Sequence, residues 1–447
     1  MPRVLYISYY FPPSGGPGVQ RTLKLARYLP EFGWTPSILT VRPEQAAYPD
    51  LDPSLEAEVP PELLVERTLA WDPYALYAKL QGKQKAETVG VGFVGESSMD
   101  WKQRLARWLR ANLFLPDARV GWVRHAVAHG RRMLNTGRYD ALITTGPPHS
   151  THLIGQRLAR EYDLPWVADF RDPWTQIDYV AELPMTQLAR ALDRRMERRV
   201  LEQASAVVTV SPAMRRQFEA QVPGAYHVIL NGFDPADFDV ASRPPQPEGT
   251  FVLRYLGNMN AARNPDVLWQ ALARLNAPTA WPDFRVELIG HIDPAVRAAV
   301  AAAGLESLVQ VRPYVQHDAA VMLMQSATAL LLVINRVSGA EGIMTGKLFE
   351  YLASGRPVVG VGPPTGDAAQ ALHDTLAGRM IGYEHVDDCA RELTRLYKAW
   401  KQGAPAPGAN PATLHPYSRR GQAEQLAGVL GALHQKKCNA KSAKEQL

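Results

Sequence analysis

Short apolar runs recur along this chain in two series, and their spacing constrains the fold more than any other feature of the sequence. Each run is rich in Val, Ile, Leu or Phe, and stretches with helical patterning separate the runs. Short continuous apolar runs are typical of parallel strands buried on both faces. The first series comprises residues 4–8, 37–41, 141–145, 166–170, 206–210 and 228–230, and the second comprises residues 251–257, 284–290, 309–315, 329–334 and 357–362. The sequence therefore predicts an α/β protein with two doubly wound parallel sheets.

The two series divide the chain into two domains, as its length of 447 residues also suggests. The first domain contains a long excursion over residues 44–120, of which 44–98 show no sustained period. The expected parts, in order, are a first domain (1–238), a Pro-rich linker (239–249), a second domain (250–414), a helix that packs back on the first domain (415–434) and a disordered tail (435–447).

Composition and charge narrow the classes of function. The chain has 49 Lys and Arg against 44 Asp and Glu, a formal net charge of +5, which lacks the dense basic blocks of a nucleic-acid binder. Its two cysteines, Cys389 and Cys438, are too few for a disulfide framework and lack metal-ligand spacing. The N-terminus has no signal-peptide pattern, and no apolar run has the length of a membrane span. We therefore expect a cytoplasmic protein that binds no nucleic acid.

The segment 342–364, GIMTGKLFEYLASGRPVVGVGPP, places a lysine where a helix does not favour one. The pattern predicts a helix over about 345–354, so Lys347 lies beside unpaired amides and about half a positive charge. The sequence leaves two interpretations open. Lys347 forms a solvated ion pair with Glu350, three residues later, or a phosphate bound at the first amides of the helix offsets the cation while Glu350 accepts hydrogen bonds from hydroxyl groups.

Polar residues directly after the other predicted strands are further candidates, because ligands of wound sheets bind beyond the carboxyl ends of the strands. These are the Gly15 loop, His149 with His152, Arg171 with Asp172, Asn231, and residues 258–263. The glycines at 15 and 16 allow backbone amides to approach a ligand closely. The loop is no dinucleotide fingerprint, because Arg21 stands where a third glycine is required. A Walker loop is also excluded, since Glu341 occupies the place of its first glycine.

The segment 101–115, WKQRLARWLRANLFL, predicts a basic amphipathic helix. Trp101, Leu105 and Trp108 fall on one helical face, and Arg104 and Arg107 lie largely off it. Such a helix either docks on its own domain or lies in an anionic membrane surface, and the sequence leaves both open.

Seven motifs in a fixed order carry a resemblance to a known family. They are PPSGG near the start, TTGPPHSTH (144–152), PWVADFRDPW (165–174), VTVSPAM (208–214), LNGFD (230–234), YLGNMNAARN (255–264) and TGKLFEYLASGRPVVGV (345–361). Over about residues 1–435 the chain resembles glycosyltransferase family 4. The resemblance implies the GT-B fold, in which two Rossmann-like domains face a central cleft. It also implies a nucleotide-sugar donor on the second domain, an acceptor on the first, and transfer with retention of anomeric configuration without a metal.

Residue by residue, the resemblance also implies how the donor is held. The diphosphate would be bound by Gly15, Gly16, Arg263, Thr345, Gly346 and Lys347. Glu350 would bind the ribose hydroxyls, and the base would lie near Gly257, Asn258, Tyr314 and Val315. Asn258 occupies a position where the family usually has an arginine, so Lys347 is expected to replace the missing cation.

The residues expected to act on the transferred sugar or the acceptor are Arg171, Asp172, His149, His152 and Glu341. Where many family members carry a histidine after the central strand of the first domain, this chain has Arg171. The family's pair of glutamates is displaced, since Gly342 stands eight positions before Glu350 and Glu341 is one residue off.

The resulting expectation is a retaining glycosyltransferase of the hexosyl or a related type. It would move a sugar from a nucleoside diphosphate to a glycan or lipid-linked acceptor in cell-surface polysaccharide or glycoconjugate biosynthesis. It would need no cofactor and would be cytoplasmic or peripheral on the inner face of the cytoplasmic membrane. Two alternatives stay open: a nucleotide-sugar epimerase of the same fold, and a non-catalytic subunit that binds nucleotide sugars.

Overall fold

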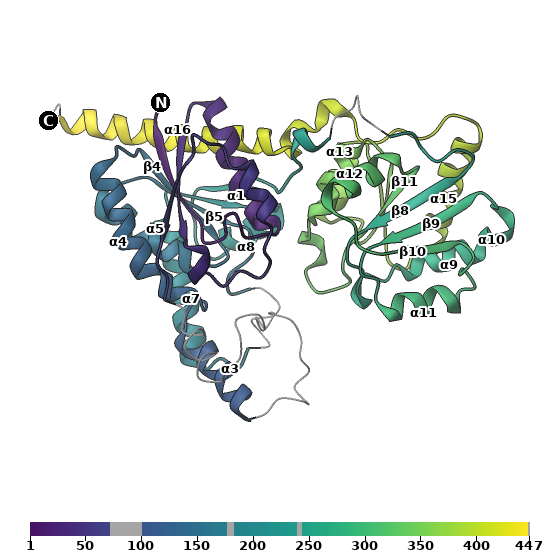
Figure 1. The fold of residues 1–447 in the computed structure, drawn as a ribbon, viewed down its shortest axis with the longest axis horizontal. Helices are drawn as coiled ribbons and strands as arrows, with labels where there is room; N and C mark the ends of the chain where they lie inside the picture. The colour runs from purple at the N-terminus through teal and green to yellow at the C-terminus, as the bar shows by residue number, and fades with distance from the viewer. Residues whose placement is uncertain (72–100, 177–182, 239–243, 446–447) are drawn as a thin grey trace. The chain divides into compact units, whose positions relative to one another are not determined.

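The computed structural model describes residues 1–71, 101–176, 183–238 and 244–445. The chain forms two compact units, each a parallel sheet covered by helices (Figure 1). The first unit consists of Met1–Ile229 with Gln422–Leu447, and the second of Leu230–Gly421. The predicted α/β class with two wound sheets is confirmed.

The sheet of the first unit has the strand order β3-β2-β1-β4-β5-β6-β7, and all its neighbouring strands pair in parallel. The strands are β1 (Arg3–Ile7), β2 (Thr35–Val41), β3 (Leu64–Thr68), β4 (Ala141–Gly146), β5 (Trp166–Phe170), β6 (Ala206–Thr209) and β7 (Tyr226–Val228). Every residue of β4, β5 and β6 is buried. This explains their unbroken apolar sequences, because helices cover both faces of the sheet.

The helices of the first unit bury two apolar clusters, one on each face of the sheet. They are α1 (Pro17–Tyr28), α3 (Trp101–Leu113), α4 (Val120–Thr136), α5 (Ser150–Tyr162), α7 (Gln187–Gln203), α8 (Pro212–Glu219) and α16 (Arg419–Glu445). One cluster joins α4, α5, α7 and α8 to the sheet. The other cluster joins α1 and the part of α16 after residue 422 to the sheet.

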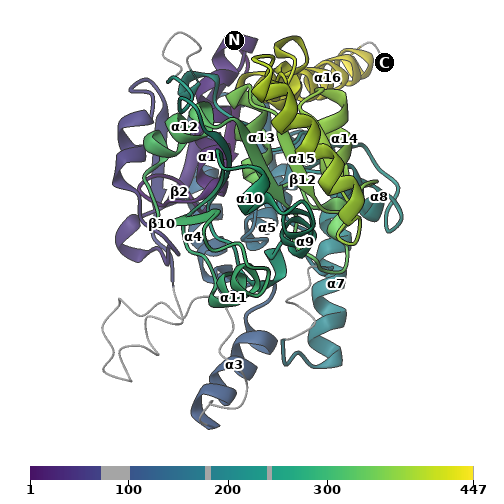
Figure 2. The ribbon, with the colours of Figure 1, turned by 90° about the vertical axis from the view of Figure 1, so that its right-hand side faces the viewer.

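The second unit repeats the design with the strand order β10-β9-β8-β11-β12-β13. Its strands are β8 (Phe251–Leu256), β9 (Phe284–Ile289), β10 (Val309–Arg312), β11 (Ala329–Val333), β12 (Val358–Val361) and β13 (Gly378–Ile381). Its helices are α9 (Asp266–Arg274), α10 (Ala277–Ala280), α11 (Pro294–Ala302), α12 (His317–Ser326), α13 (Gly346–Ser354), α14 (Asp367–Asp374) and α15 (Val386–Lys401). Helices α9, α11 and α15 cover one face of the sheet (Figure 2), and α12, α13 and α14 cover the other.

Two strands and part of the last helix differ from the predictions. Strand β3 lies inside the segment 44–98 and β13 follows α14, and neither was predicted. Both lie at a sheet edge, and no residue of β3 except Thr68 is fully buried, so their sequences lack a continuous apolar run. The tail predicted to be disordered from 435 is helical to Glu445, because α16 continues with good helix formers such as Ala, Lys and Gln.

Helix α3 exposes large apolar side chains. Trp101 and Leu113 are each 65 % exposed, and Leu105, Trp108 and Leu109 are also exposed. At its end, Asn112 binds the segment that leads into α7, donating to the carbonyl of Pro184 and accepting from the amide of Thr186. None of the helices described here combines the length and the apolar character needed to cross a membrane.

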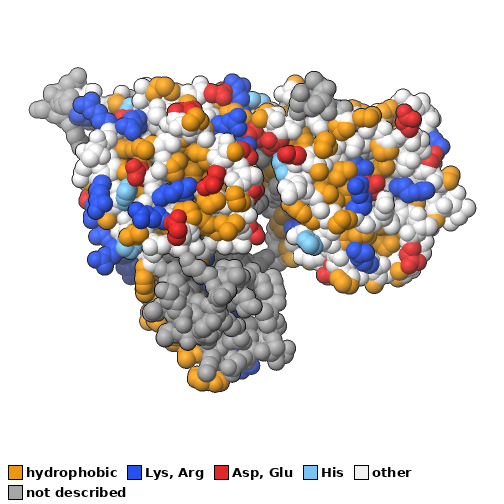
Figure 3. All heavy atoms as spheres, in the orientation of Figure 1, with side chains coloured by type: hydrophobic (Ala, Val, Ile, Leu, Met, Phe, Trp, Pro, Cys, Tyr) orange, Lys and Arg blue, Asp and Glu red, His pale blue; other side chains and the backbone are white. Residues whose placement is uncertain are grey.

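On the face of the molecule drawn in Figure 3, Lys and Arg side chains are interspersed with Asp, Glu and apolar side chains. On this face the basic side chains therefore form no single continuous block.

Candidate functional site

A lysine lies at the head of α13 in the second unit. The helix buries Leu348, Tyr351 and Leu352 completely, which leaves Lys347 half-buried on its first turn. The Lys347 ammonium donates a hydrogen bond of 2.9 Å to the hydroxyl of Tyr255 and lies 4.7 Å from the centroid of its ring. The cation therefore points toward the end of β8.

The loop after β8 is shaped to admit this lysine. Gly257 has a φ of 110°, a backbone conformation that residues with a side chain rarely adopt. A Cβ at this position would overlap the Cε and Nζ atoms of Lys347. Both the backbone and the close approach therefore require glycine at 257.

A second cation, Arg263, lies close to Lys347. Its guanidinium donates to the side-chain oxygen of Asn335 and, over 3.1 Å, to the carbonyl of Asn258. Burial, and after it the charge of Arg263, lowers the pKa of Lys347 to about 8. In the part of the chain that the structure describes, neither cation forms an ion pair with a carboxylate. The two positive charges repel each other, and an anion bound between them would offset that cost.

The first turn of α13 adds unused hydrogen-bond donors to the two cations. Thr345 is the N-cap residue, but its side chain does not cap the helix. Its hydroxyl is buried and has no partner among the described residues. The amides at Gly346 and Lys347 have no acceptor within the helix, as in any first turn. Backbone amides, a hydroxyl and two cations together suit an anion with several oxygens.

Glu350 lies one turn further along α13. Burial raises its pKa, while His317 and Lys347 are among the charges that act in the opposite direction. The described contacts contain no ion pair between Lys347 and Glu350, because the ammonium binds Tyr255 instead. The solvated pair that the sequence left open is therefore not formed.

The topology of the sheet explains why residues about 90 positions apart meet here. Strands β8 and β11 are neighbours at the centre of the sheet, where the strand order reverses. Gly257 and Arg263 follow β8, while Lys347 and Glu350 follow β11. The crevice outside the carboxyl ends of strands at such a switch point is where wound sheets bind ligands.

The other predicted residues of the second unit are less closely joined to this group. Asn258 belongs to it, since its carbonyl also accepts a 2.7 Å hydrogen bond from Tyr255. Tyr314 is 65 % exposed and stacks on His291. Val315 packs against an apolar cluster, and Glu341 is exposed in a short 3-10 turn, Ala340–Gly342. Among the described contacts, none links these last three residues to Lys347.

In the first unit, the predicted residues gather after β4 and β5. Arg171 donates to the carbonyls of Gly146 and Pro147. A Cβ on Gly18, in the first turn of α1, would overlap the Arg171 guanidinium. Arg171 therefore lies against the N-terminal turn of α1, and Asp172 beside it in the chain is exposed.

Gly15 and Gly16 differ in what their amides offer. The amide of Gly15 donates to the carbonyl of Asp50 over 3.0 Å, so it is already used. Gly16 is the N-cap residue of α1 with a φ of 96°, and no acceptor for its amide is found in the described structure. Of the two glycines, Gly16 is the better candidate for contact with a ligand.

The two histidines are buried, and their burial favours the neutral forms. His152 is 0 % exposed and stacks on Phe170, and His149 is 6 % exposed and stacks on Trp174. Burial and then Arg171 lower the pKa of His149 to about 3, and burial also lowers the pKa of His152. His152 therefore packs beneath the surface in this structure, and both ring nitrogens of His149 are buried as well.

A buried network behind His149 was not predicted from the sequence. The indole of Trp174 donates a 2.8 Å hydrogen bond to Asp193 on α7, and Thr175 donates to Glu197 one turn later. Burial raises the pKa of Asp193 to about 6, with Glu197 adding to the shift. Two acids four residues apart on an arginine-rich helix look like surface residues in the sequence, so no pattern revealed them.

The raised pKa makes a prediction about stability. Asp193 binds its proton more tightly in the folded protein than at its ordinary value of 3.8, so stability should fall as pH rises from about 4 to about 6 and stay low above that. Asp193→Asn keeps an oxygen for the indole and removes the charge. We expect it to stabilise the protein by about 1–3 kcal/mol at pH 7.5 and by much less at pH 4. Urea denaturation at both pH values measures this, and an equal effect at both would contradict it.

Asp169 is a second buried acid that the sequence did not reveal. It lies on β5 and accepts hydrogen bonds from both Nη2 and Nε of Arg21 on α1, at 2.8 and 3.1 Å, and from Thr145 on β4 at 2.9 Å. Arg21 also donates to the carbonyl of Ile229 after β7. The one clue in the sequence to this buried pair was Arg21, which stands where the dinucleotide fingerprint requires a glycine.

Among residues 1–71, 101–176, 183–238 and 244–445, no three His, Cys, Asp or Glu side chains are grouped as metal ligands. The group at the head of α13 instead presents cations, amide donors and hydroxyls.

Two curated relatives carry the name D-inositol 3-phosphate glycosyltransferase. The protein from Arthrobacter sp. is 25 % identical over 214 residues, 45 % of this chain and 49 % of that protein. The protein from Streptosporangium roseum is 26 % identical over 263 residues, 53 % of this chain and 58 % of that protein. The chain thus spans about half the length of the curated relatives it matches.

Solved structures share the fold at low sequence identity. A sucrose-phosphate synthase from Thermosynechococcus elongatus matches with a TM-score of 0.54 and 14 % identity, and the match covers 100 % of both chains. A putative UDP-N-acetylglucosamine 2-epimerase from Listeria monocytogenes matches with a TM-score of 0.54, 11 % identity and 97 % coverage of both chains. A sucrose-phosphate synthase and a putative epimerase share this fold, so the fold alone does not choose between a transferase and an epimerase.

Family matches follow the division into two units. The family described as Glycosyl transferase 4-like domain matches residues 15–232, and the family described as Glycosyl transferases group 1 matches residues 250–399. The first five motifs fall within or beside the first match, and the last two fall within the second. Together the two matches span most of the chain. This protein belongs to the GT-B glycosyltransferases of the family 4 type.

Proposed function

We propose that this protein transfers a sugar from a nucleoside diphosphate sugar to a glycan or lipid-linked acceptor, with retention of anomeric configuration. One observation carries the proposal. Lys347 and Arg263 lie together at the first turn of α13, beside the unpartnered hydroxyl of Thr345 and without a carboxylate partner among the described residues. A donor diphosphate offers the charge and the oxygen atoms that this group lacks.

The same group suits the chemistry of transfer. Breaking the bond between the sugar and the diphosphate leaves negative charge on the leaving group. Lys347, Arg263 and the first-turn amides would stabilise that charge where it forms, so they would lower the barrier as well as bind the donor. Glu350, one turn deeper, would accept hydrogen bonds from the ribose hydroxyls.

Incubation with a panel of nucleotide sugars tests the proposal. We expect one donor to be consumed, with its nucleoside diphosphate released slowly in water and faster with an acceptor, and with the α or β configuration of the sugar kept in the product. Conversion of the donor to its epimer would instead identify a nucleotide-sugar epimerase. Tight donor binding without turnover under any acceptor condition would identify a non-catalytic subunit that binds nucleotide sugars.

Activity is expected to survive metal removal. Lys347 and Arg263 supply the positive charge that a bound cation provides in other transferases, so the proposed mechanism needs no metal. Transfer rates measured after dialysis against EDTA should match those of the untreated enzyme. Complete loss of activity that manganese or magnesium restores would contradict this mechanism.

We further propose that the protein is cytoplasmic, lies on the inner face of the cytoplasmic membrane and serves cell-surface polysaccharide or glycoconjugate biosynthesis. Helix α3 supports this, since Trp101, Leu105 and Trp108 are exposed beside the exposed Arg104. Tryptophan and leucine on one face with arginines beside them are the side chains that amphipathic helices insert into anionic lipid interfaces.

Sedimentation with lipid vesicles tests whether α3 contacts the membrane. Wild-type protein should sediment with vesicles rich in anionic lipid and not with neutral ones. Changing Arg104, Arg107 and Arg110 to Gln should release it, because each basic residue near such a surface contributes about 1 kcal/mol. The matched control, Arg132→Gln on α4, should still sediment. Equal sedimentation of wild type and the triple variant would show that α3 is not the membrane contact.

A further inference from the structure

A cavity lies beyond the carboxyl ends of β2 and β3 in the first unit, and none of its lining residues is among those assigned above. Its volume is about 550 Å³, and it is lined by Arg42, Pro43, Glu44, Gln45 and Arg67. Arg42 to Gln45 follow β2 directly, and Arg67 is the penultimate residue of β3. This edge of a wound sheet is where ligands bind.

The walls of the cavity are held by defined contacts. The amide of Arg42 donates to the carbonyl of Thr68, which ties the end of β2 to the end of β3. The side-chain oxygen of Gln45 accepts a 2.8 Å hydrogen bond from the amide of Ala70. The cavity is therefore built by the two strand ends and does not depend on loose side chains.

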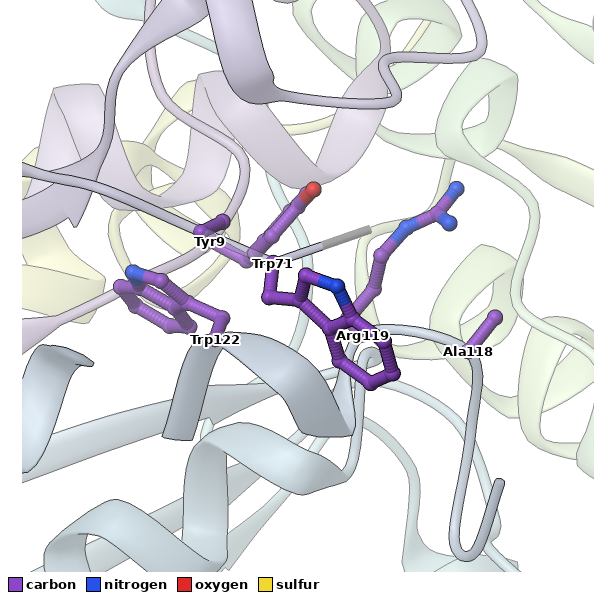
Figure 4. Close-up of a pocket in the computed structure, with 6 residues that line it drawn as sticks. Tyr9, Trp71, Ala118, Arg119 and Trp122 are labelled. Carbon is purple, nitrogen blue, oxygen red and sulfur yellow. The ribbon is translucent and has the colours of Figure 1, made fainter. Parts of the chain in front are cut away.

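Ala70 also lines a second, smaller pocket. Figure 4 shows Tyr9, Trp71, Ala118, Arg119 and Trp122 around this pocket, which is too small to hold a water molecule. Tyr9 accepts a hydrogen bond from the amide of Ala47, in the same segment as Gln45. The hydroxyl of Tyr9 therefore helps to hold the segment that carries Gln45.

Two buried polar atoms, one on the lining residue Arg67 and one on its neighbour Tyr48, have no hydrogen-bond partner in the described structure. One is Nη1 of Arg67, whose Nη2 donates to the carbonyl of Pro12 over 2.7 Å. The other is the hydroxyl of Tyr48, a residue only 8 % exposed. Burial raises the pKa of Tyr48, and Arg67 acts in the opposite direction through its charge and because its guanidinium lies within hydrogen-bonding reach of the hydroxyl, so the two groups are neighbours. Leaving buried donors unpaired costs free energy, typically about 1–3 kcal/mol each.

The charges at the cavity favour an anion with hydroxyl groups beside it. Arg42 is exposed, and in the described structure neither Arg42 nor Arg67 forms an ion pair with a carboxylate. Two guanidinium groups can bind phosphate or carboxylate through paired hydrogen bonds. Glu44, the one acid of the lining, repels an anion but accepts hydrogen bonds from hydroxyl groups. An acidic sugar presents both kinds of group.

We propose that this cavity binds the acidic group of the sugar acceptor, a phosphate or a carboxylate. Arg42 and Arg67 hold the charge, and the hydroxyl of Tyr48 donates to one of its oxygen atoms. The inference rests on the proposed function, because it is the transferase reaction that requires an acceptor. It adds that the acceptor is anionic and that its charge is recognised on the first unit.

Calorimetric titration of the full chain with glucose 6-phosphate, glucuronate and glucose tests the proposal. We expect one acidic sugar to bind and neutral glucose not to bind measurably, and comparison of the two acids distinguishes phosphate from carboxylate. Arg42→Gln should weaken that binding by about tenfold. The side chain of Arg42 has no partner in the described structure, so the melting temperature of the Arg42→Gln protein should equal that of the wild type. The matched control, Arg132→Gln on α4, should bind as the wild type does.

Tyr48→Phe separates a binding role from a packing role. It removes an unpaired buried hydroxyl, so the free protein should melt at the same or a higher temperature, while the rise in melting temperature caused by the acidic sugar should shrink. Arg67→Gln should lower affinity further, although it also loses the contact with Pro12. Absence of binding by both acidic sugars, or binding unchanged in Arg42→Gln and Tyr48→Phe, would overturn the proposal.

The fate of the donor distinguishes this failure from failure of the proposed function. If a nucleotide sugar is still bound and hydrolysed while no acidic sugar binds, only the cavity assignment is wrong. If an acidic sugar binds as expected but no donor sugar is transferred to any acceptor, the proposed function is wrong and the cavity remains an anion site.

Discussion

Replacing Lys347 by methionine is expected to lower the rate of sugar transfer by about 10²-fold or more. Methionine fills the same space against Gly257 but lacks the charge that faces the leaving diphosphate. Negative charge on that group grows toward the transition state, so the loss should be at least as large in turnover as in donor binding. Removing one comparable hydrogen-bond donor in other enzymes costs about 10²- to 10³-fold in turnover.

The pH dependence of binding gives a second measure of the same residue. Lys347 has a pKa of about 8 in the free protein, so its charged form is lost as pH rises past that value. Donor affinity of the wild type should therefore fall above pH 8, and Lys347→Met should lack this decline. Calorimetric titration with the donor between pH 7 and 9 measures both.

Glu350→Gln is the matched variant for comparison on the same helix. It keeps the size of the side chain and removes the charge that strengthens hydrogen bonds from the ribose hydroxyls, so donor affinity should fall about tenfold. Its effect on turnover at saturating donor should be smaller than that of Lys347→Met. Circular dichroism confirms that both variants fold. Unchanged affinity and turnover in both would remove the donor site from α13.

Asp169→Ala is expected to destabilise the first unit by about 3–5 kcal/mol, the typical cost of leaving a buried charge without its partner. The side chains of Arg21 and Asp169 are 1 % and 3 % exposed, so water cannot solvate the abandoned guanidinium. Thr145 would lose its acceptor as well. Urea denaturation with a probe in the first unit measures the change.

A double variant tests whether the isolated charge causes this loss. Replacing Arg21 by Met and Asp169 by Leu together removes both charges and keeps most of the volume, so it should be more stable than Asp169→Ala alone. The Arg21–Asp169 pair would not hold α1, β4 and β5 together if Asp169→Ala lowered the free energy of unfolding by less than about 1 kcal/mol. The same would follow if the double variant were less stable than Asp169→Ala.

Much of the fold was predictable because buried parallel strands carry their signal within a few consecutive residues. The runs at 166–170 and 329–334 correspond to β5 and β11, which are buried on both faces and so are apolar throughout. Strand β3 was missed, because an edge strand needs no such run. The end of α16 was missed because charged helix formers read equally well as a disordered tail.

The candidate site was predictable in part, because some of its signals also lie within a few consecutive residues. Lys347 was recognisable as misplaced in a helix start, since helix dipoles depend on local sequence alone. Its partner Tyr255 was not, because it reaches Lys347 through the adjacency of β8 and β11. His152 carried a plausible chemical signal, but its complete burial followed only from its stacking on Phe170.

The sequence by itself determined the buried strands and most helices, the presence of two wound sheets, and the loops at which the chain leaves a buried strand toward a ligand. These properties follow from periodicity, glycine and capping, which act between residues close in the chain. The tertiary structure alone decided which side chains share a site: Lys347 with Tyr255 and Arg263, Arg21 with Asp169, and Arg67 with Tyr48. The reason is that strand order and register bring distant segments to one edge of a sheet, and burial there then sets their charge states and leaves polar atoms unpaired for a ligand.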